Sequence, residues 1–368
     1  MRAEAGSGLF RASIAGLVPY EPGKPVEEVQ RELGLAHVIK LASNEGPFPP
    51  FPAALAALER AGHELNRYPD GGVYALRSAI AERHGVLLEE VVVGSGADGV
   101  IDLLSQATLD PGDEIVCGWP SFPSYVLDAL KLGATPVRVP LRDHVYDLDA
   151  LLDAITPRTK LVYVCHPNNP TGTANGRAEL LEFFERLPEH VLGVIDQAYF
   201  EYIEDPDYAD AVAEVFKAGR RVVVLRTFSK IYGLAGLRVG YGIAPPDVVA
   251  ATSKVRRAFD VSADAQAAAV ASIGDEPELA RRRELNRAGR TRLAEVLRDQ
   301  GLEPVEPALG NFVYVEVGDG RALFEQLLRQ GVIVRPLDSF GAPHAIRVSV
   351  GTPAELEQFA EALATVRA

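Results

Sequence analysis

Residues 91–99 read Val91-Val92-Val93-Gly94-Ser95-Gly96-Ala97-Asp98-Gly99, a β-branched run that leads directly into a glycine-rich turn. Apolar side chains at helical spacing follow over residues 97–107, so this stretch predicts a strand, a tight turn and a helix. Small residues at the start of that helix leave backbone N–H groups free to bind an anion. The same order recurs along the middle of the chain, which predicts βαβ units and a largely parallel sheet, buried on both faces.

The rest of the chain divides into a middle that alternates strands with helices and two ends that do not. The pattern predicts strands at 114–117, 161–165, 191–195, 222–225 and 238–243, with helices at 177–187 and 209–218. Toward the ends it predicts helices at 26–33 and 321–330, long helices between 262 and 300, a last helix, and strands at 312–317, 332–335 and 346–350. We therefore expect an α/β protein with a large domain and a smaller α+β domain to which both chain ends contribute. The expected limits are residues 1–42 (arm and part of the small domain), 43–260 (large domain) and 261–368 (small domain).

Composition restricts the class of protein. The 368 residues are 47% hydrophobic and 24% charged, which is typical of a globular chain that buries a large core. The formal net charge of −14 argues against general nucleic-acid binding, which needs a basic face. No apolar run is long enough to span a membrane, and residues 1–10 lack the apolar core of an export signal, so we expect a cytoplasmic protein without membrane contact.

Cysteine and histidine usage gives no sign of a metal site. The two cysteines, Cys117 and Cys165, are too few for a disulfide framework and have no zinc-ligand spacing. Each follows an apolar run, which predicts buried thiols at strand ends. The seven histidines include no His-x-x-x-His pair, so we expect no metal.

Polar side chains gather directly after the predicted strands, where ligands of parallel sheets bind. The loop after residue 93 is glycine-rich, and the loop after residue 165 contains Asn168 and Asn169. Asp196 and Tyr199 follow the next strand, and the loop after residue 225 contains Thr227, Ser229 and Lys230, with Arg238 eight residues further on. A carboxylate, amides, hydroxyls, a lysine and an arginine at one sheet edge indicate a cofactor site.

The glycine-rich loop also fits the Gly-x-Gly-x-x-Gly pattern of dinucleotide sites. A nicotinamide site expects an acidic residue at the end of the following strand, where this chain has Cys117-Gly118-Trp119-Pro120. About 90 residues also precede the loop, whereas the fingerprint opens its domain. The interpretation that remains is a single phosphate held at a helix N-terminus.

Lys230 is the candidate nucleophile. Most lysines are solvated surface charges, but this one follows an apolar strand and is surrounded in sequence by Phe228, Ile231 and Leu234. An amine held in such surroundings loses solvation, so its pKa falls and it becomes nucleophilic. Arg238 offers a guanidinium for a phosphate.

These motifs together resemble the pyridoxal-phosphate aminotransferases of fold type I, class II, and among them the histidinol-phosphate aminotransferase family and its aromatic-aminotransferase relatives. The resemblance covers nearly the whole chain. It rests on this ordered set of segments: Ser43-Asn44-Glu45, Arg67-Tyr68-Pro69-Asp70, Pro167-Asn168-Asn169-Pro170-Thr171-Gly172, Asp196-Gln197-Ala198-Tyr199, Thr227-Phe228-Ser229-Lys230, Arg238-Val239-Gly240, Asn311-Phe312 and Arg347-Val348-Ser349-Val350-Gly351.

The resemblance implies pyridoxal 5′-phosphate as the cofactor, bound as a Schiff base on Lys230, which also moves the substrate proton. It implies that Asp196 pairs with the pyridine nitrogen and keeps it protonated. Asn169 and Tyr199 are expected to hydrogen-bond the ring hydroxyl oxygen, and Phe122 to stack on the ring, a role that nearby Trp119 matches less well. The phosphate is assigned to the loop and to the residues around Lys230: Gly96, Ala97, Asp98, Thr227, Ser229 and Arg238.

The resemblance also implies the partners. Arg347 is expected to bind the carboxylate of an amino acid or the phosphate of histidinol phosphate, and Tyr20, Asn44 and Arg335 are assigned to the substrate. Two arginines and a phenol suit a phosphate dianion better than a lone carboxylate. Tyr68 is expected to reach the cofactor phosphate of a neighbouring subunit, which implies a homodimer.

The expected activity is amino transfer between glutamate/2-oxoglutarate and the pair histidinol phosphate/imidazole-acetol phosphate. An aromatic amino-acid aminotransferase is the nearest alternative, and a phosphothreonine-type decarboxylase with the same cofactor is a more distant one. Gln197 stands where glutamate is usual, and Ile231 stands where a small residue is usual. We expect Ile231 to narrow the space beside the cofactor.

Overall fold

A seven-stranded sheet forms the centre of the larger part of the protein in the computed structural model, which describes residues 8–19 and 23–368. Over these residues the strand order is β2-β8-β7-β6-β5-β3-β4, and every neighbouring pair is parallel except the two pairs that β8 makes. This mixed, mostly parallel sheet confirms the expected α/β class. The strands are β2 (Val91–Gly94), β3 (Glu114–Trp119), β4 (Thr135–Pro140), β5 (Thr159–Cys165), β6 (Leu192–Asp196), β7 (Val222–Thr227) and β8 (Gly240–Ile243).

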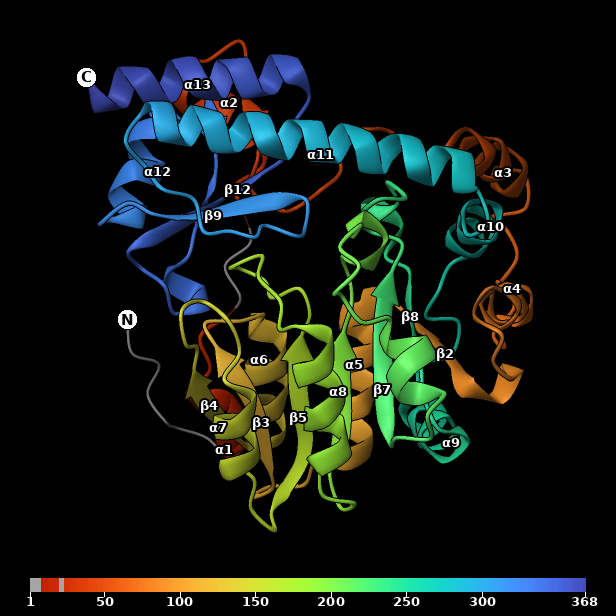
Figure 1. Ribbon diagram of the computed structural model, residues 1–368. Helices are drawn as coiled ribbons and strands as arrows, with labels where there is room; N and C mark the ends of the chain where they lie inside the picture. Colours follow the sequence, from red (N-terminus) through yellow and green to blue (C-terminus); the bar gives the residue numbers. More distant parts are fainter. Residues whose placement is uncertain (1–7, 20–22) are drawn as a thin grey trace.

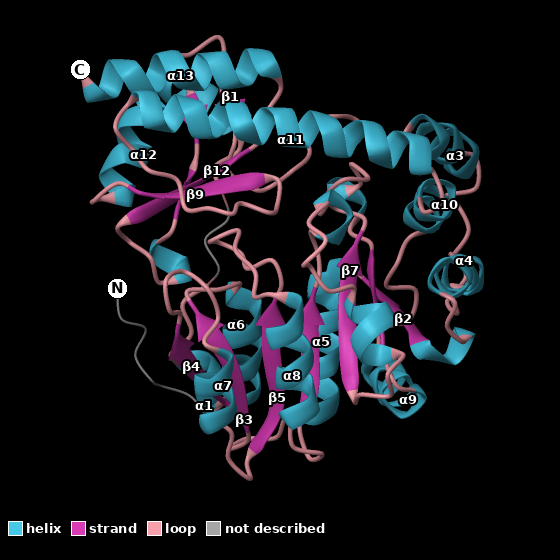
Figure 2. Cartoon of the chain, in the orientation of Figure 1, coloured by secondary structure: helices cyan, strands magenta, loops and turns pink. Residues whose placement is uncertain are grey.

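Helices cover both faces of this sheet (Figures 1 and 2). Because each face is covered, the central strands are buried along almost their whole length, which explains their largely apolar sequences. Three further helices stand as a column beside β2, at the right of Figure 1, and α1 lies against α6. The helices on the sheet are α5 (Gly96–Thr108), α6 (Pro123–Leu132), α7 (Leu148–Asp153), α8 (Arg177–Arg186) and α9 (Pro246–Val255); the column holds α3 (Pro52–Gly62), α4 (Tyr74–His84) and α10 (Ala263–Ser272), and α1 spans Ala12–Ala15.

Two elements of the larger part differ from the sequence expectations. The edge strand β4 was not among the expected strands. It contains Pro136 and Pro140, and an edge strand tolerates proline, since one side of it has no hydrogen-bonding partner. The helix expected at 209–218 is a single π-helical turn, Val212–Phe216. Asp210 accepts a hydrogen bond from the N–H of Val212 at its start, and Gly219 with φ +83° follows its end.

A second hydrophobic core lies in the smaller part, at the upper left of Figure 1. Segments from both chain ends build it: Val29 and Leu41 share this core with Val348 and Phe359. The domain limits at 42/43 and 260/261 stay a prediction. The elements are an antiparallel sheet β11 (Arg335–Pro336), β12 (Ala345–Ser349) and β9 (Phe312–Glu316), a parallel pair β1 (Ile39–Lys40) and β10 (Val332–Ile333), and the helices α2 (Val26–Leu33), α11 (Glu276–Asp299), α12 (Gly320–Arg329) and α13 (Pro353–Arg367).

The long helix α11 connects the two cores. Leu279 near its start belongs to the larger core, whereas Leu293 and Leu297 near its end belong to the smaller one. Figure 1 shows the helix running across the top of the molecule between them. The smaller part is therefore held above the carboxyl ends of the parallel strands, where the polar loops lie.

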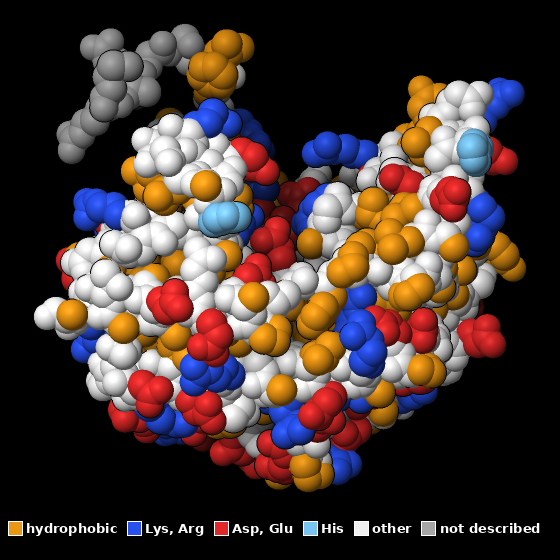
Figure 3. Space-filling model, turned by 90° about the horizontal axis from the view of Figure 1, so that it is seen from above, with side chains coloured by type: hydrophobic (Ala, Val, Ile, Leu, Met, Phe, Trp, Pro, Cys, Tyr) orange, Lys and Arg blue, Asp and Glu red, His pale blue; other side chains and the backbone are white. Residues whose placement is uncertain are grey.

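The surface and the helices add two observations. Acidic and basic side chains are interspersed over the face seen from above in Figure 3, rather than gathered into one basic area. Within residues 8–19 and 23–368, no helix has both the length and the apolar character that a membrane span requires.

Gly240 marks a close approach between β8 and the start of α5. A Cβ atom at position 240 would lie 2.3 Å from the backbone nitrogen of Ala97, so any side chain here must displace the helix terminus. We predict that Gly240→Ala lowers the free energy of unfolding by about 1–3 kcal/mol, measured by urea denaturation. Gly274→Ala is the matched control, because a Cβ there meets nothing within 4 Å. Equal stability of the two variants would contradict this account.

Candidate active site

A cavity of about 120 Å³ lies at the edge of the sheet where β5, β6 and β7 end. Because β2 runs parallel to β7 through the antiparallel β8, the end of β2 and the start of β8 lie at this edge as well. The loops after four strands thus meet, as the sequence predicts. The cavity is lined by Ala97, Asp98, Phe122, Cys165, Asn169, Asp196, Ala198, Tyr199, Thr227, Ser229, Lys230 and Arg238.

One end of the cavity is built for an anion. Helix α5 begins at Gly96, whose φ of +78° suits glycine, and its first N–H groups face this end. The Arg238 guanidinium lies on the glycine, since a Cβ at position 96 would be 2.7 Å from Nη2. Arg238 Nη1 donates to Ser229 Oγ at 3.3 Å, and Thr227 Oγ1 accepts from the Ser229 N–H at 3.1 Å. A helix terminus, a guanidinium and a hydroxyl together favour a phosphate.

Asp196 supplies a buried carboxylate at the end of β6. Oδ2 accepts a hydrogen bond from Tyr125 Oη at 2.7 Å, and Oδ1 accepts one from the Ala198 N–H at 3.1 Å. Burial raises the pKa of this carboxyl above its usual value, while the two hydrogen bonds and the charge of Lys230 act in the opposite direction. These two hydrogen bonds hold the carboxylate in a fixed orientation, ready to accept a hydrogen bond from a group in the cavity.

Tyr125 is a residue that the sequence analysis missed. It lies on α6, three residues after Phe122, and stacks on Tyr163 of β5 with ring centroids 4.3 Å apart. Burial raises the pKa of the Tyr125 phenol well above its ordinary value, so the phenol remains a neutral donor to Asp196. The only signal in the sequence is its spacing of nearly one helical turn from the predicted stacking residue.

Lys230 follows β7, and its half-buried side chain lines the cavity. Burial lowers the pKa of this amine from the ordinary lysine value to about 8, and the positive charges of Arg347 and Arg238 act in the same direction. Its Nζ lies 5.4 Å from the centroid of the Tyr199 ring. The structure therefore agrees with the expected lowering of the Lys230 pKa, through loss of solvation and the two nearby positive charges.

The smaller part of the protein reaches the cavity through Arg347 of β12. One guanidinium nitrogen, Nη1, donates to Asn169 Oδ1, and Nη2 donates to the carbonyl oxygen of Ala42 at 2.8 Å. Asn44, two residues further along from Ala42, donates from Nδ2 to Tyr199 Oη at 2.9 Å. Burial raises the pKa of the Tyr199 phenol, which keeps this group neutral.

Arg335 lies beside Arg347. The two residues are register partners across β11 and β12, and both side chains are buried. Arg335 Nη2 also donates to Ser339 Oγ at 3.4 Å, and each guanidinium carbon lies within 5.5 Å of the centroid of the Phe340 ring. Two positive charges are therefore held side by side above the cavity.

One predicted residue, Tyr68, lies elsewhere. Tyr68 is 83% exposed and stacks on Phe259 with ring centroids 4.6 Å apart, so it is outside the cavity of its own chain. Tyr20 lies outside the described residues.

Trp119 packs under the Arg138 guanidinium, whose carbon lies 4.7 Å from the ring centroid, and Phe122 lines the cavity instead. Both cysteines are buried and unpaired.

Ile231 does not have the expected effect. Its side chain is buried in the larger hydrophobic core and is not among the residues that line the cavity, so it does not narrow the space there. The residue points away because the chain turns directly after Lys230, where the Gly233 N–H bonds back to the Lys230 carbonyl.

Gln197 has an environment that suits an amide. Its Nε2 donates to the Ala209 carbonyl oxygen at 2.8 Å, and its Oε1 accepts from the buried Arg226 at 2.9 Å. A glutamate could not donate to the carbonyl, so the unusual glutamine matches its partners. These bonds anchor the backbone next to Asp196.

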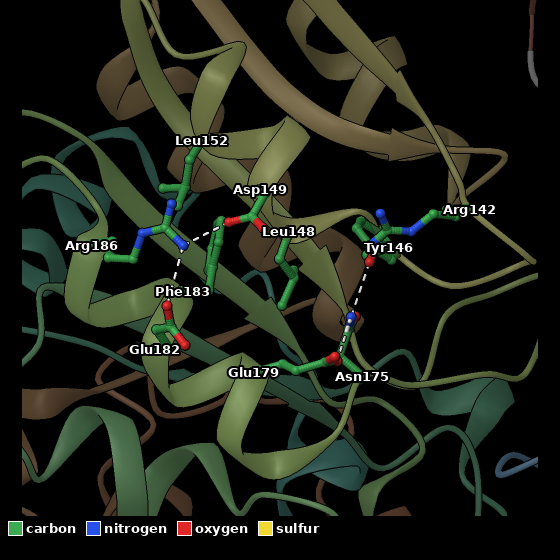
Figure 4. Close-up of a pocket in the computed structure, with 10 residues that line it drawn as sticks. All are labelled: Arg142, Tyr146, Leu148, Asp149, Leu152, Asn175, Glu179, Glu182, Phe183 and Arg186. Carbon is green, nitrogen blue, oxygen red and sulfur yellow. Dashed lines mark hydrogen bonds and ion pairs between the residues drawn. The ribbon is translucent and has the colours of Figure 1, made fainter.

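Size alone does not single out this site. A second cavity, of about 100 Å³, is lined by residues of α7, of α8 and of the segments that precede these helices (Figure 4). Its charged side chains are engaged with one another: Arg186 pairs with Asp149 and Glu182, and Asn175 donates to the Tyr146 carbonyl and to Glu179. None of the predicted site residues lines it. The converging polar groups and the altered pKa values distinguish the cavity at Lys230.

Comparison with known proteins agrees with this geometry. Residues 36–363 match the family Aminotransferase class I and II. The chain belongs to this family. A histidinol-phosphate aminotransferase from Moorella thermoacetica is 46% identical over 360 residues, which is 97% of this chain and 93% of that protein. One from Akkermansia muciniphila is 46% identical over 356 residues, 96% of this chain and 97% of that protein.

Solved aminotransferase structures are also similar to this chain over nearly its whole length. The histidinol-phosphate aminotransferase of Sinorhizobium meliloti, in complex with pyridoxal-5′-phosphate, superimposes with a TM-score of 0.89 at 29% identity and covers 99% of both chains. A Thermus thermophilus aspartate aminotransferase mutant gives a TM-score of 0.83 at 26% identity, covering 96% of this chain and 99% of that one. The aminotransferase therefore has the fold type I architecture that its motifs indicate.

The pKa of Lys230 predicts how this aminotransferase reacts with an aldehyde. With a pKa of about 8, roughly one-tenth of the amine is neutral at pH 7 and most is neutral at pH 9. The rate constant for covalent capture of pyridoxal 5′-phosphate by the cofactor-free protein should rise several-fold over this range and level off, as followed by absorbance in stopped flow. Lys230→Ala should show no covalent capture. A rate that still rises steeply above pH 10 would contradict the depressed pKa.

Proposed function

We propose that this protein is a pyridoxal-phosphate-dependent histidinol-phosphate aminotransferase. It exchanges an amino group between glutamate/2-oxoglutarate and histidinol phosphate/imidazole-acetol phosphate. The relatives that share nearly its whole length carry that name, and the structurally similar Sinorhizobium enzyme is described in complex with the cofactor. The observation that carries the substrate assignment is the buried pair of Arg335 and Arg347 on neighbouring strands.

The cavity fits pyridoxal phosphate on chemical grounds. Its anion end, formed by the α5 terminus with Arg238 and Ser229, suits a phosphate, and the glycine at position 96 leaves the room that a Cβ would fill. A buried carboxylate, Asp196, suits a protonated ring nitrogen, and Phe122 offers an aromatic face. The amine of Lys230 suits the aldehyde. The assignments of Gly96, Ala97, Asp98, Thr227 and Asn169 to the cofactor stay predictions.

When bound, the cofactor supplies an electron sink for the bond that breaks at the substrate Cα. Asp196 keeps a negative charge beside the ring nitrogen, and Tyr125 and the Ala198 N–H hold that carboxylate in place. Lys230, with its lowered pKa, would act as a neutral amine that carries the proton between the substrate Cα and C4′ of the cofactor. Arg347 orients the substrate, and its bond to Asn169 links substrate binding to the cofactor pocket.

Two adjacent guanidinium groups favour a phosphate on the substrate. A dianion with several acceptor oxygens can engage both Arg335 and Arg347, whereas a phenyl side chain offers neither guanidinium an acceptor oxygen. The adjacent guanidinium groups therefore favour histidinol phosphate over phenylalanine as the substrate.

We predict that kcat/KM for histidinol phosphate exceeds that for phenylalanine, and that Arg335→Gln reduces the former by about 100-fold or more. The same change should reduce kcat/KM for phenylalanine far less, since no phosphate is lost there. Steady-state kinetics with 2-oxoglutarate as acceptor measures both values.

Arg290→Gln is the control, because Arg290 is a partly buried arginine that binds the Gly310 carbonyl in the small part of the protein. A higher value for phenylalanine in the unmodified enzyme would instead support an aromatic amino-acid aminotransferase. Release of carbon dioxide without amino transfer to 2-oxoglutarate would support a decarboxylase.

We also propose a homodimer in which Tyr68 of one copy reaches the anion end of the other copy's cavity. The support is that Tyr68 is an exposed aromatic residue beside Phe259, and that Phe259 lines a groove of about 590 Å³ that also contains Arg238. A phenol placed in that groove could hydrogen-bond a phosphate held by Arg238.

Co-expression of two impaired variants tests this arrangement. In dimers that combine Lys230→Ala with Tyr68→Ala, one site carries both defects and the other carries neither. Random mixing should therefore restore intact sites to about one-quarter of the total, whereas each variant alone remains impaired. Activity equal to the average of the separate variants would show that the two residues act in the same subunit.

A further inference from the structure

Ser349 lies at the end of β12, two residues after Arg347, and its hydroxyl is buried against Asn44. The Asn44 backbone N–H donates to Ser349 Oγ at 2.8 Å. The Ser349 hydroxyl in turn donates to Asn44 Oδ1 at 3.0 Å. The serine therefore contacts both the backbone and the side-chain amide of the same asparagine.

This double contact sets the direction of the next hydrogen bond. An asparagine amide has one oxygen that accepts and one nitrogen that donates. With Oδ1 bound to Ser349, Nδ2 faces Tyr199 and donates to its Oη at 2.9 Å. The Tyr199 oxygen is then an acceptor from Asn44, so its own hydrogen is available to donate into the cavity that Tyr199 lines.

The opposite orientation of the amide would reverse this effect. If Oδ1 faced Tyr199, the phenol would donate its hydrogen to Asn44 and would have none for a group in the cavity. The Asn44 backbone has φ +53°, a conformation that Asn adopts more readily than most residues, and Asn311 Nδ2 binds the Asn44 carbonyl oxygen at 3.0 Å. The backbone is thus held from both sides, and the serine hydroxyl determines which end of the amide meets the phenol.

We propose that Ser349 is a positioning residue that acts through Asn44 to keep the Tyr199 hydroxyl a hydrogen-bond donor toward the cofactor's ring oxygen. This inference rests on the proposed function, because it assumes pyridoxal phosphate in the cavity. It assigns to the small part of the protein a second contribution beside Arg347: Ser349 sets the direction of a hydrogen bond without touching the ligand.

The test is the pH dependence of the visible absorbance of the enzyme with bound cofactor. A donor to the anionic ring oxygen favours the state of the cofactor that has lost a proton, so loss of the donor raises the pH midpoint. Ser349→Ala should raise the midpoint by about 0.5–1 pH unit, the value of one neutral hydrogen bond. Ser349→Thr, which retains the hydroxyl, should restore the midpoint of the unmodified enzyme.

A double-mutant cycle shows whether the effect passes through the phenol. In a Tyr199→Phe background, Ser349→Ala should cause no further shift. An equal shift in both backgrounds, or no shift in the unmodified background, would overturn the proposal. Ser272→Ala is the control for loss of a buried hydroxyl, since Ser272 Oγ donates only to the Ala268 carbonyl on α10, and it should leave the midpoint unchanged.

Asn44 variants keep the proposal testable if Ser349→Ala does not fold. Asn44→Gly preserves the positive-φ backbone but removes the amide, and should shift the midpoint in the same direction. Asn44→Asp can only accept from Tyr199 and should shift it further upward. An unchanged midpoint in both would overturn the proposal. If the unmodified enzyme shows no visible cofactor absorbance at all, the proposed function fails instead, and the two failures are thereby distinguishable.

Discussion

An amine and a carboxylate buried at one edge of one sheet impose the main constraint on this structure. Lys230 and Asp196 come from neighbouring strands, β7 and β6, and each must be removed from water without losing its reactivity. Burial acts on both, lowering the pKa of the amine and raising that of the carboxyl. The surrounding hydrogen bonds then keep the carboxylate oriented, and Tyr125 is the most direct of these supports.

The small part of the protein contributes side chains to the site at the edge of the sheet. Arg347 binds Asn169, and Ser349 binds Asn44, so two side chains on the same face of β12 each contact a residue at the cavity. Side chains alternate along a strand with a period of two, so residues 347 and 349 lie on the same face. A shift of one residue in register would turn both side chains to the opposite face. The pairing of β12 with β9 and β11 is consequently a requirement of the site as well as of the fold.

Much of this arrangement could be predicted from the sequence, because loops that follow parallel strands must meet at one edge. That rule alone brings Asn169, Asp196, Ser229 and Lys230 together. It could not find Tyr125, whose position depends on how α6 packs on β5, nor the edge strand β4 with its prolines. The expectation for Ile231 was wrong because it also depends on tertiary structure. The tight turn after Lys230 places the Ile231 side chain in the larger hydrophobic core instead of the cavity.

The hydrogen bonds that support the cavity include one between Asn44 and Ser349, which are 305 positions apart in the chain. Contacts of such long range close late in folding, after local helices and neighbouring strands have formed. During synthesis, a chain still lacking β12 on the ribosome already holds the lysine, the aspartate and the anion-binding helix. The nascent protein therefore carries Lys230 before it carries Arg335 and Arg347, the two arginines proposed to bind the substrate.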